Sequence, residues 1–175
     1  MPTLVVVDMQ PMFAASRPGW LIGNVSEEIR AAWGAGHAVV FLEYAIDHKG
    51  RPAGVPVRST THRCLIDLVS DYDGAIVAHK ASQDGSEQVE AVLSSMGCEA
   101  GRPYDDSIRI VGVETGVCVA RTANGLGSRM PDTDIVVVAH ACNTHRYGAP
   151  PPLGPNNDGQ DRIETGGNVQ ILRVA

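Results

Sequence analysis

Polar residues stand directly after, or just beyond, five short aliphatic runs of this chain. They are Asp8, Glu43, Lys80, the segment 114–118 and His140. In open α/β sheets, ligands bind outside the carboxyl ends of the strands, near the point where the strand order reverses. If the aliphatic runs are strands, these positions are therefore the candidates for binding and catalysis.

Three of these candidates have side chains that could take part in catalysis: the thiol of Cys118, the carboxyl group of Asp8 and the amine of Lys80. If Thr115 caps a helix, Cys118 lies in its first turn, where the helix dipole favours the thiolate and should lower the thiol pKa; otherwise Cys118 is a small buried residue. Asp8 either caps a neighbouring helix or is partly desolvated, which raises a carboxyl pKa unless a cation compensates. Lys80 either pairs with a buried carboxylate or stays a solvated loop charge.

The elements that would position these residues alternate along the chain. Aliphatic, β-branched runs predict strands covered on both faces at residues 4–7, 38–42, 75–78, 108–113 and 135–139, with an edge strand at 169–174. Apolar residues at helical spacing predict helices within 24–33, 61–69, 86–96 and 115–126. This alternation predicts an open, mainly parallel α/β sheet with right-handed crossovers. Segment 147–167 contains four prolines and predicts a long loop.

Length and composition fit one domain spanning residues 1–175, with 43% hydrophobic and 19% charged residues. The formal net charge is −6 without a basic stripe, which disfavours nucleic-acid binding. The four cysteines are far apart and form no C-x-x-C pair, as expected of reduced thiols in the cytoplasm. The sequence predicts neither a signal peptide nor a membrane span.

Two motifs give the chain a family resemblance. Residues 8–13 read D-x-Q-x-x-F directly after the first predicted strand, and residues 112–123 read G-x-x-T-x-x-C-V-x-x-T-A. With Lys80 between them, residues 3–139 resemble the isochorismatase-like cysteine hydrolase superfamily, which includes nicotinamidases and N-carbamoylsarcosine amidase-type enzymes. The resemblance implies six strands in the order 3-2-1-4-5-6, with helices on both faces of a Rossmann-like three-layer sandwich.

The resemblance also implies a catalytic apparatus. Asp8, Lys80 and Cys118 would form a triad, and a cis peptide bond between Val113 and Glu114 would help to aim the N–H groups of Glu114 and Cys118 at an oxyanion. Family members that act on isochorismate lack the cysteine. The expected reaction is therefore cleavage of a C–N bond in a small amide or ureide through a thioester, without a cofactor, by a homo-oligomer.

Some segments depart from the family pattern and leave alternatives open. Ala81–Gly85 replaces S-A-F-type residues after the lysine, and His140 stands where an aspartate is usual. A non-catalytic binding or regulatory protein would keep the fold while losing the reaction. A nicotinamidase would hold a divalent metal, for which Asp47, His48 and His62 are the candidate ligands. The sequence by itself predicts no metal site.

Overall fold

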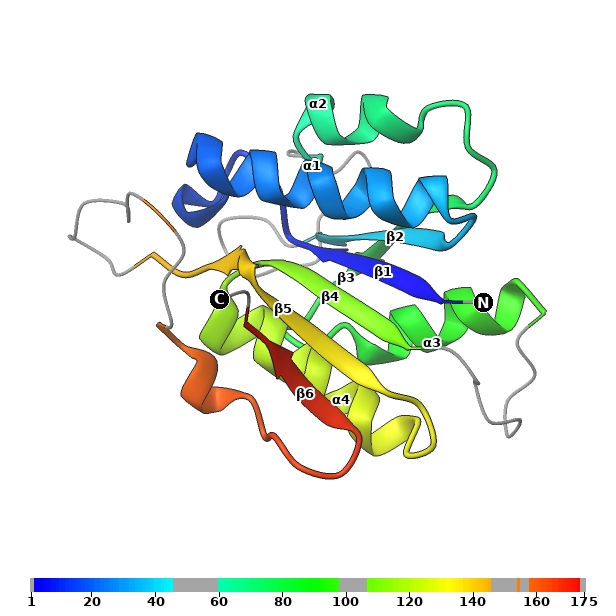
Figure 1. Ribbon diagram of the computed structural model, residues 1–175, viewed down its shortest axis with the longest axis vertical. Coiled ribbons are helices and arrows are strands. Elements are labelled where there is room, and N and C mark those ends of the chain that lie inside the picture. The colour runs from blue at the N-terminus through cyan, green and yellow to red at the C-terminus, as the bar shows by residue number, and fades with distance from the viewer. Residues whose placement is uncertain (1, 46–59, 98–106, 146–153, 155–157, 174–175) are drawn as a thin grey trace.

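The structure is a computed structural model that describes residues 2–45, 60–97, 107–145, 154 and 158–173 (Figure 1). Six strands form one sheet in the order β3-β2-β1-β4-β5-β6, and every neighbouring pair is parallel. The strands are β1 (Thr3–Val7), β2 (Ala38–Tyr44), β3 (Ala75–Lys80), β4 (Ile108–Val113), β5 (Ile135–Asn143) and β6 (Val169–Leu172). The predicted open parallel α/β sheet and its strand order are confirmed.

Helices cover both faces of this sheet (Figure 1). The α-helices are α1 (Gly19–Gly34), α2 (Arg63–Ile66), α3 (Ser86–Ser95) and α4 (Ala120–Arg129). Four shorter turns are the 3₁₀ turns η1 (Ala14–Ser16), η2 (Asp67–Val69) and η4 (Gln160–Arg162) and the π-helical turn η3 (Thr115–Val119). Helices α1 and α2 lie on one face, and α3 and α4 lie on the other. Among the described helices, none has the length and apolar character that crossing a bilayer requires.

The central strand β1 shows why the strand sequences are aliphatic throughout. Leu4 and Val6 pack with the residues of α1, whereas Val5 and Val7 pack with those of α3 and α4. Successive side chains of a strand point to opposite faces, so a strand covered on both faces needs apolar residues at every position. Burial of these two layers of side chains is the main stabilisation of the sheet.

Three helix predictions differ from the structure. Helix α1 begins at Gly19 after Pro18, so Asn24 is not its cap; the Asn24 Nδ2 instead donates a hydrogen bond of 2.6 Å to the carbonyl oxygen of His140. The predicted helix at 61–69 is one α-helical turn followed by a 3₁₀ turn. The last predicted helix opens with η3, and Glu114, not Thr115, occupies its N-cap position.

Strand β5 is longer than the sequence predicted, and His140 lies within it. Ile110 pairs with Val137 but Gly112 pairs with Cys142, so β5 carries extra residues in a bulge. With these extra residues β5 continues past His140 to Asn143. The prediction that His140 follows the end of the strand was therefore wrong. The His140 Nε2 lies 3.5 Å from Glu28 Oε1 on α1.

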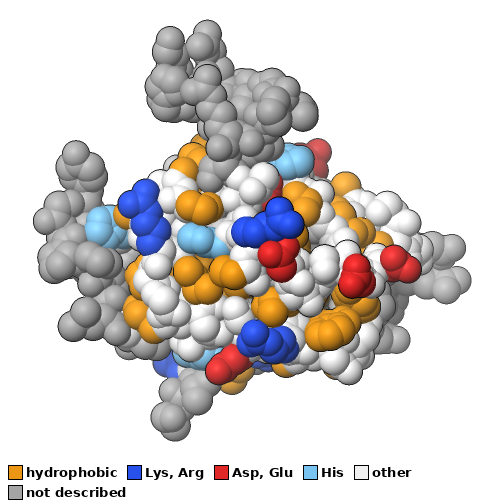
Figure 2. Space-filling model, turned by 90° about the horizontal axis from the view of Figure 1, so that it is seen from above, with side chains coloured by type: hydrophobic (Ala, Val, Ile, Leu, Met, Phe, Trp, Pro, Cys, Tyr) orange, Lys and Arg blue, Asp and Glu red, His pale blue; other side chains and the backbone are white. Residues whose placement is uncertain are grey.

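The predicted loop at 147–167 lies partly outside the described residues. Within the described portion, Gln160–Arg162 forms the turn η4 and Ile163 is buried against the core. Figure 2 shows the face above α1 and α2, where basic, acidic and apolar side chains are interspersed over the described surface.

Candidate active site

The candidate site lies where the carboxyl ends of β1 and β4 run side by side. The order β2-β1-β4 makes this the point at which the chain crosses from one half of the sheet to the other. Gly112 of β4 pairs with Val7, has a φ of +119°, and a Cβ on it would overlap the Val7 carbonyl oxygen. Only glycine allows the two strands to approach this closely. The residues that follow them, Asp8 and the turn containing Cys118, are thereby brought together.

Asp8 has a backbone conformation that few residues adopt. Its φ is +51°, in the left-handed region, and Asp8 is the only described non-glycine residue with a positive φ. Its N–H donates to Leu42 O at 2.8 Å, and its carbonyl accepts from Gln10 N at 2.7 Å. Such local strain concentrates at functional sites. The carboxylate is thus turned away from the path of the strand and into the protein.

Lys80 reaches Asp8 across the end of β2. Its Nζ lies 2.9 Å from Asp8 Oδ2, and both side chains are at most 1% exposed. The same ammonium group donates to Ser82 O at 3.1 Å and lies 4.6 Å from the centre of the Tyr44 ring. Lys80 is therefore a buried ion-pair partner and not a solvated loop charge.

The segment after Lys80 departs from the family pattern and closes over the lysine. A Cβ on Gly85 would lie 2.9 Å from Lys80 Cδ and would overlap Leu42. Gly85 N–H donates to Thr122 Oγ1 at 3.1 Å, which fastens this segment to α4. The unusual sequence Ala81–Gly85 thus still encloses the lysine.

The two acidic groups of the site both bind their protons more tightly than usual. Burial raises the pKa of Asp8 against the opposing effects of Lys80 and Cys118. Burial, with the Asp8 charge, raises the pKa of the Cys118 thiol to about 12, although Lys80 acts in the other direction. The predicted lowering of the thiol pKa was wrong because desolvation and a nearby carboxylate outweigh the helix dipole. Sulfur therefore keeps its proton at neutral pH, beside a carboxylate able to accept it.

The carboxylate of Asp8 has hydrogen-bond partners within the site. Its Oδ2 lies 2.9 Å from Lys80 Nζ, and side-chain hydrogen bonds with Lys80 and Cys118 act to lower the pKa of Asp8 against the effect of burial. The thiol and the carboxylate are therefore close enough for a proton to pass from one to the other.

The turn before Cys118 is fixed from two sides. The Val113–Glu114 peptide bond is cis. Glu114 O accepts from the N–H groups of Val117 and Val119 at 3.0 and 3.1 Å. Glu114 Oε2 accepts from Thr144 Oγ1 at 2.6 Å and from His145 N at 2.9 Å, which ties this turn to the chain leaving β5.

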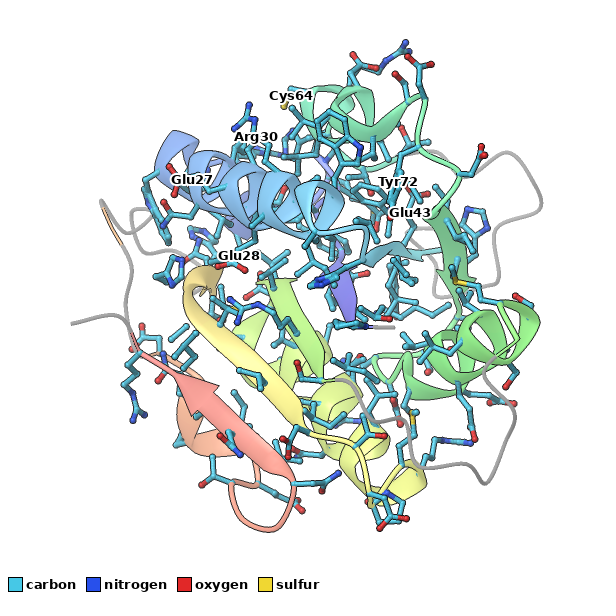
Figure 3. The ribbon with its side chains drawn as sticks, turned by 45° about the vertical axis from the view of Figure 1, so that its right-hand side comes forward. Glu27, Glu28, Arg30, Glu43, Cys64 and Tyr72 are labelled. Carbon is cyan, nitrogen blue, oxygen red and sulfur yellow. The ribbon has the colours of Figure 1, made fainter. Side chains whose placement is uncertain are left out.

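Glu43 is a further buried carboxylate, which the sequence placed among the candidate positions without a specific role. It lies near the end of β2 (Figure 3) and is 1% exposed. Its Oε1 accepts from Thr61 N at 2.7 Å, and its Oε2 lies 3.4 Å from His79 Nε2. Its negative charge contributes to the raised pKa of Asp8. The available signal was an acidic residue among the aliphatic residues of a covered strand.

The other sequence candidates include His62, which lies near this group, and Asp47 and His48, which lie outside the described residues. The main-chain N–H of His62 donates to the carbonyl oxygen of Met9, the residue after Asp8, at 2.8 Å. His62 Nε2 is 3.0 Å from Ser16 Oγ, and burial lowers the pKa of His62. In the described part of the chain, no three His, Cys, Asp or Glu side chains converge as a metal site would require. His140 makes its described side-chain contact with α1, through Glu28.

A pocket of about 330 Å³ adjoins the turn that carries Cys118. It is lined by Gln83, Gly116, Val117, Ala120, Arg121 and Arg162. Val117 is the residue before Cys118, and Gln83 follows Lys80 by three positions. The pocket therefore lies beside the turn that carries Cys118, on the side of α4 and η4, and Asp8, Lys80 and Cys118 are not among its lining residues.

This arrangement agrees with a comparison against known protein families. Residues 2–147 match the family model described as the Isochorismatase domain, and the chain belongs to this family. By sequence, no curated protein matches the chain.

Solved structures share the fold at low sequence identity. The chain is similar to the nicotinamidase of Bacillus subtilis (TM-score 0.70, 15% identity, 98% of this chain and 99% of that chain covered). It is similar to the pyrazinamidase of Pyrococcus horikoshii in complex with zinc (TM-score 0.68, 18% identity, 99% of each chain). It is also similar to the MAR1 ribonuclease of Caenorhabditis elegans (TM-score 0.62, 19% identity, 83% of this chain and 66% of that chain). The fold alone therefore does not define the reaction.

Proposed function

We propose that this protein is a cysteine hydrolase that cleaves the C–N bond of a small amide or ureide through a thioester. The observation that carries the proposal is the buried ion pair of Asp8 and Lys80, 2.9 Å long, beside the thiol of Cys118. Membership of the isochorismatase family and similarity to structures named nicotinamidase and pyrazinamidase support an amide as the substrate.

The first half of the proposed reaction moves one proton and forms one bond. The Asp8 carboxylate takes the thiol proton of Cys118 as sulfur attacks the carbonyl carbon of the substrate. The main-chain N–H groups of Glu114 and Cys118 stabilise the resulting oxyanion, an effect commonly worth about 3–4 kcal/mol per donor. The raised pKa of Asp8 suits this step, because it makes the carboxylate a stronger base.

The second half returns the site to its starting state. Protonated Asp8 gives its proton to the departing nitrogen as the C–N bond breaks, and the acyl group remains on sulfur as a thioester. Asp8 then takes a proton from the water that attacks the thioester and gives it to the Cys118 sulfur as the C–S bond breaks. This step releases the carboxylic acid, or a carbamic acid where the substrate is a ureide. In this scheme Lys80 holds Asp8 in place and balances the negative charge that passes between oxygen and sulfur.

An ammonia-release screen over small amides and ureides tests the proposal. We expect the wild-type protein and Cys64→Ala to release ammonia, since Cys64 is exposed on α2 (Figure 3). Cys118→Ala should release none. Mass spectrometry of the wild-type protein quenched during turnover should find an acyl group on Cys118. Turnover that survives in Cys118→Ala would contradict the proposal.

A nicotinamidase with a bound divalent metal is the second candidate, favoured by the names of the structural neighbours. Asp47, His48 and His62 would hold the metal beside the substrate. His62 would first have to give up its contact with Ser16. Metal analysis of the purified protein, together with ammonia release from nicotinamide, distinguishes this candidate from a metal-independent amidase.

A non-catalytic protein would behave differently in both assays. It would release ammonia from no amide, and Asp8→Asn would leave the alkylation rate of Cys118 unchanged. We expect neither result, because Asp8, Lys80 and Cys118 are all retained and all buried.

We propose two further properties that accompany this function. A reducing compartment such as the cytoplasm suits a catalytic thiol, and the described cysteines Cys64, Cys118 and Cys142 are free. A homo-oligomer would bury the exposed apolar side chains Trp33 on α1 and Val77 on β3. Sedimentation of the purified protein measures its subunit number.

A further inference from the structure

The pocket beside Cys118 has an unusual electrostatic character for this protein. Two of its six lining residues, Arg121 and Arg162, carry a positive charge, and none carries a negative one. The chain as a whole has a formal net charge of −6. A small hollow lined by cations on an acidic protein favours an anionic ligand.

Close packing of two glycines, Gly116 and Gly159, brings Arg162 to this pocket. A Cβ on Gly116 would lie 2.9 Å from Gly159 Cα and 3.5 Å from Arg162 Cγ, so the absence of a side chain at Gly116 lets η4 lie directly on η3. Gly159 itself has a φ of +81°. Two adjacent glycines of this kind bring segments 43 residues apart into contact.

Asn124 of α4 fastens the same segment from the other side. Its Nδ2 donates to the carbonyl oxygen of Arg162 at 3.2 Å, and its Oδ1 accepts from Glu164 N at 3.0 Å. Ile163 between these contacts is 4% exposed and packs in the core. The backbone at Arg162 is therefore held rigidly, whereas its side chain is exposed at the pocket.

Arg121 enters the pocket from α4 itself. It follows Cys118 by three positions, and Val117 and Ala120 on either side of the cysteine line the same pocket. Neither Arg121 nor Arg162 has a side-chain ion pair within the described part of the chain, unlike Arg129 farther along α4, which pairs with Glu90 at 2.9 Å. Both guanidinium groups are thus available to a ligand in the pocket.

We propose that Arg121 and Arg162 bind a carboxylate on the substrate, so that the substrate is a small amide or ureide with an anionic end. Guanidinium groups bind carboxylates through paired, charge-assisted hydrogen bonds. A volume of about 330 Å³ suits a small ligand. The assignment of the amide end rests on the proposed function; the anion subsite itself does not.

Binding to the Cys118→Ala protein tests the subsite without chemistry. The probes are malonamate, succinamate and glutaramate, each compared with the neutral diamide of the same length, and calorimetry gives the affinities. We expect at least one carboxylate to bind about tenfold more tightly than its diamide at low salt, with the advantage falling as salt screens the charges. When Arg121→Gln or Arg162→Gln is introduced into the Cys118→Ala protein, the affinity for the carboxylate should fall about tenfold, and the affinity for the diamide should change little.

Arg129→Gln is the matched control, since it removes an arginine of the same helix outside the pocket, and it should leave all affinities unchanged. Inorganic phosphate distinguishes a carboxylate subsite from a general anion site. Arginine-dependent binding of phosphate without that of any carboxylate would overturn the assignment. So would equal affinity for every carboxylate and its diamide.

The two proposals can fail separately. If the wild-type protein hydrolyses neutral amides as fast as their carboxylated counterparts, the hydrolase stands and the subsite is wrong. If carboxylates bind in an arginine-dependent way but Cys118→Ala does not alter ammonia release, the subsite stands and the thiol mechanism is wrong. In an active enzyme, Arg162→Gln should raise KM for a carboxylated amide and affect kcat much less.

Discussion

The ammonium group of Lys80 lies 2.9 Å from the carboxylate of Asp8, although a whole strand, β2, separates the strands that carry them. Both groups are buried, and Tyr44 and Glu43 of the intervening strand lie beside the pair. Desolvating two charges costs several kcal/mol per ion and is repaid only by a well-formed interaction. A structural protein gains little from such a pair, whereas a hydrolase gains a positioned base.

Removal of one partner from this pair should destabilise the protein. We expect Asp8→Asn or Lys80→Met to lower the free energy of unfolding by about 3–5 kcal/mol, because each leaves the other charge buried without its partner. The double variant should lose much less than the sum of the two. Urea denaturation with linear extrapolation measures all three. Additive losses below about 1 kcal/mol would show that the pair is not buried in solution.

The Cys118 thiol should remain protonated far above the pKa of an ordinary cysteine. Thiolate absorbance at 240 nm, taken as the difference between the wild-type protein and Cys118→Ala, should be absent at pH 8 and appear only toward pH 12. Because the folded-state pKa exceeds the unfolded one, native protein binds more protons between about pH 9 and 12, and stability falls as pH rises through that range. Cys118→Ala removes this contribution. A thiolate signal that titrates below pH 8 would contradict the expectation.

Parts of this site could be predicted from the sequence, because they depend on the pattern of residues in each strand and on the order of the strands. The aliphatic runs predicted the covered strands, and the strand order that the family resemblance implied placed Asp8 and Cys118 after neighbouring strands. The bulge in β5 was missed, since pairing with β4 and not local pattern decides where that strand ends. The direction of the Cys118 pKa shift was also missed, because it depends on how deeply the thiol is buried beside Asp8. The surroundings of residues such as Glu43 and Arg162 depend on segments that are distant in the sequence, and the local pattern does not reveal them.

The acid side of the pH–rate profile should report the Asp8 carboxyl group. The base must be ionised, so kcat/KM should fall as pH drops through the raised pKa of Asp8. Glu43→Gln removes a nearby negative charge, lowers that pKa and moves the acid limb to lower pH. Glu90→Gln on the surface of α3 is the control and should leave the limb in place. A limb that does not move in Glu43→Gln would mean that Asp8 does not limit the rate there.

Gly112 should be the least replaceable glycine near the site. An alanine there would force a Cβ into the Val7 carbonyl oxygen at a φ of +119°, so Gly112→Ala should lower the free energy of unfolding by more than about 2 kcal/mol. Gly23 of α1 is the matched control, because a Cβ at Gly23 would have no neighbouring atom within 4 Å and alanine favours a helix. Gly23→Ala should therefore stabilise the protein by up to about 1 kcal/mol. If Gly112→Ala unfolds at the same urea concentration as the wild type, β1 and β4 do not approach each other as closely as described. The proposed reaction would then be contradicted, because it needs this approach to bring Asp8 and Cys118 together.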